Sequence, residues 1–286
     1  MSHRLGRRRI IAGLAASLIG GVPVARRTLG APAVVPGSDL PGWRLAFYDE
    51  FDGPRLDRAR WKTTLPWDGL SAHTLAPNGE RQYYIADRHD LDLGIDPFRL
   101  GAGVLAIEGK PTPNLPRSAA GPLLYTSGII TSERSFGQTY GLWRMRARLP
   151  PGKGLWPGFW MGATARHWPP ELDPLEAFGA SNGRGEGGPT WYHFGAIGAS
   201  GAWTDVGVDL YSDFHVYEVE WRPETCVFRF DGREVGHTAT PKTAHEDMFC
   251  LANLAIGGNW PGLPDAANRW PARLLIDWIR VYRQAA

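Results

Sequence analysis

The segment Trp143-Arg-Met-Arg-Ala-Arg-Leu149 alternates apolar and charged residues at every step. Successive side chains of a β-strand point to opposite faces, so this period of two predicts a strand with one face in the core and one in water. Residues 217–221 repeat the alternation, and residues 226–230 and 233–235 flank Asp231-Gly232, a dipeptide typical of a hairpin turn. These segments predict antiparallel β-structure.

The rest of the chain adds strands and no long helix. Residues 274–282 are apolar on both faces apart from Asp277 and Arg280, which predicts a buried strand. No segment of about 12 or more residues places apolar residues at the helical period, and no internal repeat is visible. We therefore expect an all-β fold, a sandwich of two antiparallel sheets.

The composition is that of an ordinary globular protein. The 286 residues are 43% hydrophobic and 21% charged, with a net charge of +2, which gives no reason to expect a nucleic-acid partner. The 36 glycines and 24 prolines are spread between the apolar segments, so they predict turns rather than disorder. Cys226 and Cys250 are the only cysteines, and the sequence leaves open whether they form a disulfide or stay as buried thiols.

The N-terminal segment differs in kind from the rest. Arg7 to Arg9 precede the apolar stretch Ile10 to Ala25, which is short for a membrane span, and Ala31-Pro-Ala33 resembles a cleavage site of small residues. The arginines followed by two isoleucines resemble a twin-arginine export signal. We therefore expect an export signal peptide at residues 1–33, one domain at residues 34–286, and a periplasmic or secreted protein with no membrane partner after cleavage. An N-terminal membrane anchor or a disordered basic tail is the alternative.

Three acids lie close together in the extended segment Glu171-Leu-Asp-Pro-Leu-Glu176. Glu171 and Asp173 are two residues apart and share one face of a strand, whereas Glu176 would point to the other face. A β-bulge before Glu176 would return its carboxylate to the first face, and Pro174 is consistent with a bulge because proline donates no hydrogen bond to a ladder. The sequence therefore predicts a bulged strand that carries three carboxylates into one cleft.

This spacing suits the hydrolysis of a glycosidic bond. The outer backbone positions would lie roughly 13 Å apart, and two inward-leaning glutamates can reach the separation of about 5 to 5.5 Å that a retaining glycosidase needs. The shorter Asp173 fits beneath them, where it can hydrogen-bond one carboxyl group and separate the pKa values of the pair. A solvated strand face is the alternative. A metal centre is less favoured, because hydrolytic metal sites usually include histidine and none lies within the motif.

Tryptophan is frequent for one domain, with 13 in the chain. Sugar rings have flat apolar faces, so a glycan cleft needs aromatic platforms as well as polar groups. Trp156, Trp160, Trp168 and Trp260 lie near the acids or in turn-like segments and are candidates for such platforms. Those on the alternating strands, such as Trp143, are better explained as core residues.

A series of motifs accompanies these features, and through them the chain resembles glycoside hydrolase family 16, in its laminarinase-like branch with the bulged acidic motif. The motifs are FYDEFDG at 47–53, NGERQYY at 78–84, YTSG at 125–128, TYGLW at 139–143, GLWPGFW at 154–160, WPPELDPLE at 168–176, DFHVY at 213–217 and NLAIGGNWPG at 253–262. The resemblance covers nearly all of residues 34–286 and is specific in this order.

The resemblance implies a β-jelly roll whose concave sheet forms an open cleft for endo-acting hydrolysis. Glu171 is then the nucleophile, Asp173 the assisting carboxylate and Glu176 the general acid/base of a retaining reaction that needs no cofactor. The substrate is a polysaccharide, a β-1,3 or mixed-linkage β-glucan or a bacterial exopolysaccharide, and the protein is expected to be a monomer. A transglycosylase on the same fold, or a non-catalytic glucan-binding protein, is the alternative; binding proteins of this kind have lost the glutamates that this chain keeps.

Further positions are implied by the same resemblance. The implied substrate-binding residues are Asn78, Glu80, Trp156, Trp160, His193 and Trp260. For His193 a core histidine is the alternative. The implied ligands of a structural calcium are Glu50, the Gly103 backbone and Asp277, and an acid at position 277 in an otherwise apolar strand needs a partner or a cation.

One position departs from the laminarinase-like pattern. These proteins commonly place an arginine directly after Tyr-Thr-Ser-Gly, near the catalytic site, and here that residue is Ile129. An aliphatic side chain there would hold fewer sugar hydroxyls, so unbranched β-1,3-glucan is expected to be a poorer substrate. The segments WPPELD and FGQTYG are more similar to the bacterial branch thought to cut exopolysaccharides such as succinoglycan.

Overall fold

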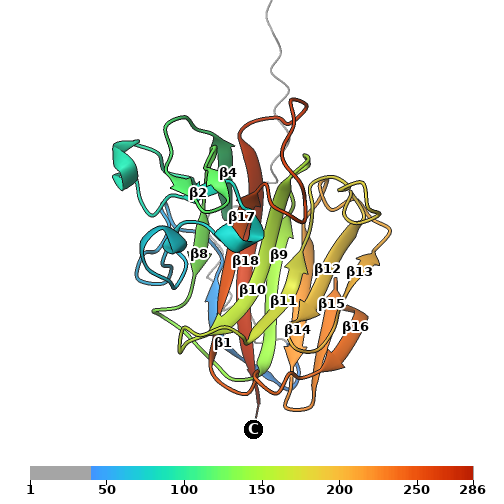
Figure 1. Cartoon of the computed structure of the whole chain (residues 1–286). Coiled ribbons are helices and arrows are strands. Elements are labelled where there is room, and N and C mark those ends of the chain that lie inside the picture. Colours follow the sequence, from blue (N-terminus) through green and yellow to red (C-terminus); the bar gives the residue numbers. More distant parts are fainter. Residues whose placement is uncertain (1–39, 286) are drawn as a thin grey trace, which may run out of the picture. The chain divides into compact units, whose positions relative to one another are not determined.

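The computed structural model describes residues 40–285, and these form two main sheets packed face to face (Figure 1). The expected signal peptide at residues 1–33 lies outside the described residues. The strands are β1 (Trp43–Asp49), β2 (Gln82–Tyr84), β3 (Phe98–Gly101), β4 (Val104–Pro111), β5 (Arg117–Ser118), β6 (Gly121–Pro122), β7 (Tyr125–Ser127), β8 (Ile129–Thr131), β9 (Gly141–Arg148), β10 (Leu155–Ala163), β11 (Glu171–Glu176), β12 (Trp191–Ala196), β13 (Gly201–Asp205), β14 (His215–Trp221), β15 (Thr225–Phe230), β16 (Arg233–Ala239), β17 (Met248–Ile256) and β18 (Ala272–Gln284). Three short 3-10 helices lie at η1 (Gly69–Ala72), η2 (Ala76–Asn78) and η3 (Asp90–Asp92).

The two sheets confirm the expected all-β jelly-roll sandwich. The larger sheet has the order β16-β15-β14-β9-β18-β4-β7-β2, with β1 paired to β18 and β3 paired to β4. The six-stranded sheet has the order β13-β12-β11-β10-β17-β8. Pairing is antiparallel throughout these sheets except between β2 and β7, which are parallel, an exception that the alternating segments did not predict.

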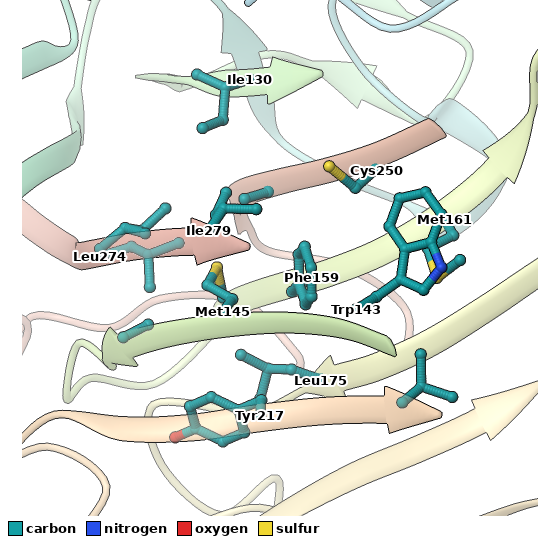
Figure 2. Close-up of a cluster of buried hydrophobic side chains, with 14 of the residues drawn as sticks. Ile130, Trp143, Met145, Phe159, Met161, Leu175, Tyr217, Cys250, Leu274 and Ile279 are labelled. Atoms are coloured by element: carbon teal, nitrogen blue, oxygen red, sulfur yellow. The ribbon is translucent and has the colours of Figure 1, made fainter. Parts of the chain in front are cut away.

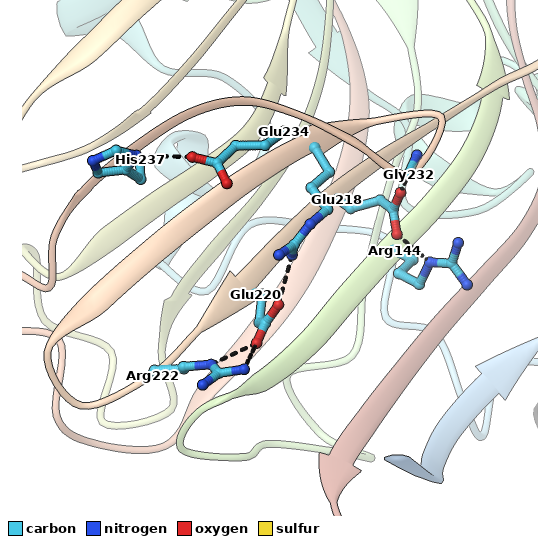
Figure 3. Close-up of polar contacts among 8 residues, drawn as sticks. Arg144, Glu218, Glu220, Arg222, Gly232, Glu234 and His237 are labelled. Carbon is cyan, nitrogen blue, oxygen red and sulfur yellow. Dashed lines mark hydrogen bonds and ion pairs between the residues drawn. The ribbon is translucent and has the colours of Figure 1, made fainter. Parts of the chain in front are cut away.

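The predicted strand at residues 143–149 corresponds to β9, at the centre of the larger sheet. Trp143, Met145 and Ala147 are fully buried, and the arginines between them point outward. Two of these arginines pair with carboxylates on neighbouring strands: Arg146 with Asp277 of β18, and Arg144, whose Nε lies 2.5 Å from the Glu218 carboxylate of β14 (Figure 3). The period of two therefore separates an apolar face from a charged face.

The core lies between the two sheets. Met145 of β9 and Tyr217 of β14 share one buried cluster with Phe159 of β10 and Leu175 of β11 (Figure 2). Full burial of such a side chain contributes roughly 1.5 to 3 kcal/mol. Because β10 and β11 bury these residues on their inner faces, alternate residues of the same strands are left on the outer face of the six-stranded sheet.

Two other expectations concern local features. The hairpin between β15 and β16 turns at Asp231 and Gly232, which both have positive φ, 48° and 78°, as a tight hairpin turn requires. Cys226 on β15 and Cys250 on β17 are free buried thiols and form no disulfide. Burial raises the pKa of Cys226 to about 11 and that of Cys250 to about 12, so neither thiol is activated. Over residues 40–285, no helix has the length and apolar character needed to cross a bilayer.

Candidate active site

A β-bulge in β11 brings the three acids of the motif together, as the sequence predicts. Against β10, Leu175 pairs with Phe159 and Leu172 pairs with Met161, so Trp160 stands opposite two residues, Asp173 and Pro174. The pairing with β12 shows the same extra residue between Asp173 and Glu176. Leu172 and Leu175 therefore point into the core, while all three acids line one cleft.

The cleft lies on the outer face of the six-stranded sheet and is closed at one side by the loops before β2. Its lining residues come from these loops and from β2, β10, β11 and β17: Leu65, Leu75, Asn78, Glu80, Tyr84, Trp156, Gly158, Trp160, Glu171, Asp173, Glu176, Asn253 and Ala255. Seven of the residues expected from the sequence thus meet in one place, although Asn78 and Glu80 are separated from the acids by about 90 residues of chain.

Burial and nearby negative charge raise the pKa values of Glu171 and Asp173. Burial, followed by the negative charge of Glu176, raises the pKa of Glu171 to about 7. Burial also raises the pKa of Asp173, and the charges of the two glutamates add to the effect. The indole N–H of Trp168 donates to Glu171 Oε2 at 3.0 Å, which stabilises the ionised form of Glu171. The coupled carboxyl groups can therefore share a proton near neutral pH, and a general acid beside a nucleophilic carboxylate requires one shared proton of this kind.

Asp173 differs in one respect from the expectation. Its side chain is buried between the two glutamates, with 4% of its surface exposed, but in the described part of the chain no hydrogen bond joins it to either of them. Its influence on the pair is therefore electrostatic in this structure.

His193 lies on β12, directly opposite Glu176 on β11. Its Nδ1 atom is 3.1 Å from Glu176 Oε2, so it is a partner of the expected acid/base rather than an isolated core histidine. Room for the ring depends on Gly201, because a Cβ atom at that position would lie only 2.7 Å from His193 Nε2. The ring is thereby held over the strand β13 backbone.

A hydrogen-bonded chain under the cleft fixes the second aromatic platform. Trp160 Nε1 donates to Asn253 Oδ1 at 2.8 Å, and Asn253 Nδ2 donates to the hydroxyl of Tyr84 at 2.9 Å. Asn253 and Tyr84 were not among the expected site residues, although both fall within the motifs. Their presence on strands that pair or pack only in the folded protein explains why their roles were missed. Likewise, the sequence predicts Trp168 only as an aromatic platform, whereas in the structure its indole also donates to Glu171.

Glu80 is buried at the end of the cleft and is held by its own loop. Its carboxylate accepts hydrogen bonds from the Asn78 side chain and the Leu75 backbone N–H, both at 3.2 Å, and from Gln82. Burial is the main cause that raises the pKa of Glu80 to about 7. Glu80 therefore stabilises the loop that presents Asn78 to the cleft, and it also lines the cleft itself.

Comparison with known proteins gives the family. The profile of glycosyl hydrolases family 16 matches residues 80–280. The chain belongs to glycosyl hydrolase family 16. An endo-1,3-1,4-beta-glycanase, ExsH, from Rhizobium meliloti (strain 1021) is 34% identical over 243 residues, which cover 82% of this chain and 51% of that protein. A beta-glucanase from Rhodothermus marinus is 30% identical over 272 residues, which cover 86% of this chain and 89% of that protein.

Solved structures support the same family assignment. The catalytic domain of an endo-1,3-beta-glucanase (laminarinase) from Thermotoga petrophila RKU-1 aligns with a TM-score of 0.72 and 28% identity, over 85% of this chain and 99% of that one. The chain spans about half the length of the two Rhizobium meliloti relatives that it matches.

Two of the three residues expected to bind calcium in this family 16 domain, Glu50 and Asp277, already have arginine partners. Arg280 donates two hydrogen bonds of 2.8 Å to the Glu50 carboxylate, and Arg146 donates one of 2.7 Å to Asp277. Gly103 lies near the Glu50 backbone carbonyl. Over residues 40–285, no cluster of three or more His, Cys, Asp or Glu is arranged to hold a metal ion. The partner that Asp277 requires is an arginine, and these side chains give no support to a calcium site.

The expectation that residue 129 faces the sugar is wrong. Ile129 has no exposed surface and packs in an apolar cluster with Leu65, Tyr84, Phe249 and Leu251. Leu65 and Tyr84 line the cleft and Ile129 does not. The loop before β2 therefore covers position 129, and an aliphatic residue there supports the cleft from below.

Proposed function

We propose that this chain is a retaining endo-β-glycanase that hydrolyses β-1,3 or mixed-linkage β-glucans or a bacterial exopolysaccharide. The observation that carries the proposal is the bulge of β11, which turns Glu171, Asp173 and Glu176 into the same cleft. A regular strand would have pointed Glu176 into the core. The bulge leaves one residue of β11 without a partner in the ladder, and in exchange Glu176 faces the cleft. Bulges of this kind occur next to active sites.

The proposed reaction proceeds by double displacement. Glu176 protonates the leaving glycosidic oxygen while Glu171 attacks the anomeric carbon, and a glycosyl ester forms on Glu171. Glu176, now a carboxylate, removes a proton from water, and the water cleaves the ester with the original configuration restored. The hydrogen bond from Trp168 orients the carboxylate of Glu171, and the contact with His193 orients the carboxyl group of Glu176. Asp173 repels further negative charge and so favours a shared proton on the pair.

Relatives support the substrate class. Their names describe an endo-1,3-1,4-beta-glycanase and a beta-glucanase, which act on β-linked glycans within the chain or on β-glucans. The cleft of this protein carries Trp156 and Trp160 beside the acids, and aromatic faces beside polar groups suit a pyranose chain. Unbranched β-1,3-glucan therefore remains a candidate substrate, because the Ile129 side chain does not reach the cleft.

The test is hydrolysis of a panel of glycans by the purified protein. Laminarin, a mixed-linkage β-glucan and a bacterial β-linked exopolysaccharide are incubated separately, and reducing ends, product sizes and the anomeric configuration of the first product are followed by NMR. An endo-acting retaining enzyme releases medium-length β-anomers first. Release of α-anomers, or of monosaccharides only, would contradict the proposal, and transfer to added acceptor sugars would reveal a transglycosylase.

We also propose that the protein is exported and acts as a monomer in the periplasm or outside the cell. The support is the arginine cluster at residues 7–9 followed by a short apolar stretch, which is typical of a twin-arginine signal. The size of the mature protein in solution, measured by light scattering, tests the monomer.

A further inference from the structure

The segment Ser181-Asn-Gly-Arg-Gly-Glu-Gly-Gly188 follows the acidic strand and is absorbed by none of the roles above. It forms a compact loop, in which the Asn182 backbone N–H donates to the Glu186 carbonyl at 3.0 Å. Gly183, Gly185 and Gly187 have φ of 81°, 84° and 75°, a region that favours glycine. The alternating glycines therefore set the backbone so that Arg184 and Glu186 project from a closed turn.

Both side chains that project from this loop hold the same tryptophan. Glu186 Oε2 accepts a hydrogen bond of 3.0 Å from Trp260 Nε1, and a second one of 2.6 Å from the Asn182 side chain. Arg184 Nη2 donates to the Trp260 carbonyl at 2.7 Å and to the Asn259 carbonyl at 3.3 Å. The loop thus fixes both the backbone and the indole of a residue that lies 74 positions further along the chain.

The Trp260 indole stands where the cleft wall meets the expected acid/base. Its ring packs edge to face against Trp156, with centroids 5.6 Å apart, and against His193, at 5.2 Å. Trp156 lines the cleft, and His193 is the hydrogen-bond partner of Glu176. Phe178 also packs edge to face against the indole, with centroids 5.0 Å apart. A change in the orientation of the Trp260 ring would therefore displace both Trp156 in the cleft wall and His193, the partner of Glu176.

Aromatic contacts alone do not choose this plane. Edge-to-face packing is nearly satisfied over a range of ring orientations, whereas the single indole N–H must point at its acceptor. Glu186 is half-buried, and a carboxylate in that position has an energetic cost unless donors surround it. The two donors of Glu186 are the Trp260 indole and the Asn182 side chain. The carboxylate therefore orients the indole and also helps to close the loop.

We propose that Glu186 is a positioning residue that sets the orientation of Trp260, and that Trp260 is thereby held as a wall for a sugar ring next to the Glu176–His193 pair. This inference rests on the proposed glycanase function and extends it to a residue outside the acidic motif. Glu186 acts through Trp260 and touches neither the reacting bond nor the catalytic carboxyl groups.

The test compares Glu186→Ala, Trp260→Phe and the double variant on the best glycan of the panel. Each single variant deletes the same hydrogen bond, so each is expected to raise KM about tenfold with kcat within about threefold. The double variant should be little worse than either single variant, because the bond can be lost only once. Glu186→Gln keeps an acceptor oxygen and should restore KM to near the wild-type value. Glu234→Ala, which removes an exposed carboxylate of β16, is the matched control.

A structural role for Glu186 gives a different pattern. If Glu186→Ala lowers the melting temperature but leaves KM unchanged, or if the effects of Glu186→Ala and Trp260→Phe multiply in the double variant, the proposal is overturned. If the wild-type protein cleaves no glycan of the panel, the proposed function fails instead. Affinity electrophoresis in gels that contain each polysaccharide then measures the same five variants, and equal retardation of wild type and Glu186→Ala would also overturn the inference.

Discussion

His193 Nδ1 lies 3.1 Å from Glu176 Oε2, across the pairing of β12 with β11. The histidine is thereby a direct partner of the carboxyl group that is proposed to donate and remove the proton. His193→Ala is expected to lower kcat about tenfold, since a hydrogen bond to a charged group is worth about 1.5 to 3 kcal/mol. KM should change little, because the glycan does not need this bond to bind. Steady-state kinetics on the best substrate checks both values, and an unchanged kcat would remove His193 from the mechanism.

Glu171→Gln and Glu176→Gln are each expected to lower kcat by several orders of magnitude while the fold is kept, because the side-chain volume hardly changes. Their roles can be separated with azide. A small anion should rescue Glu171→Gly by direct attack and give an α-glycosyl azide, whereas rescue of Glu176→Gly should give the β-azide, since Glu171 still forms the ester. NMR of the products distinguishes the two, and the reverse pattern would exchange the assigned roles.

The charge of Glu171 should make stability depend on pH. Its pKa is raised in the folded protein from the ordinary 4.5 to about 7, by burial first and by Glu176 second. The folded state therefore binds this proton more tightly than the unfolded state, and the contribution of Glu171 to the free energy of unfolding falls as pH rises from 4.5 through 7. The loss is up to about 3 kcal/mol.

Glu171→Gln removes this loss because glutamine is neutral at every pH. The melting temperatures of variant and wild type should be about equal at pH 4.5. At pH 8 the variant should melt several degrees higher than wild type. Thermal unfolding at the two pH values measures the difference. The same difference in melting temperature at pH 4.5 and pH 8 would show that ionisation of Glu171 does not destabilise the fold.

Ile129→Arg is expected to destabilise the protein rather than to change its substrate. Ile129 is fully buried among apolar residues, and an unpaired charge at such a position costs about 3 kcal/mol or more. A fall of about 10 °C in melting temperature follows for a domain of this size, whereas Ile129→Val should cost only about 1 kcal/mol. Thermal unfolding of both variants is the measurement. A stable Ile129→Arg protein with raised activity on laminarin would instead place residue 129 at the sugar.

The export proposal depends on Arg7 and Arg8. Their joint replacement by lysine is expected to leave unprocessed precursor in the cytoplasm, because the twin-arginine route requires the arginine pair. Cell fractionation and immunoblotting of wild type and variant provide the test. Unchanged secretion of processed protein would point to the general secretory route.

The bulged strand shows how much of the site could be predicted from local sequence. The period of two assigns Glu171 and Asp173 to one face, and the odd spacing of Glu176 together with Pro174 already requires an extra residue. The hairpin at Asp231-Gly232 was predicted for a similar reason, since both residues accept positive φ. In such cases the decisive interaction lies within a few residues of chain.

The sequence by itself determined the alternating strands, their buried faces, the hairpin turn and the three acids of one cleft, because side-chain alternation and turn geometry are local properties. Only the tertiary structure decided that Ile129 lies beneath a loop, that Asp277 pairs with Arg146, and that Glu186 holds Trp260. These contacts join segments tens to more than a hundred residues apart. Which side chains meet across such distances depends on sheet register and on loop placement, and neither is encoded in the pattern of one segment.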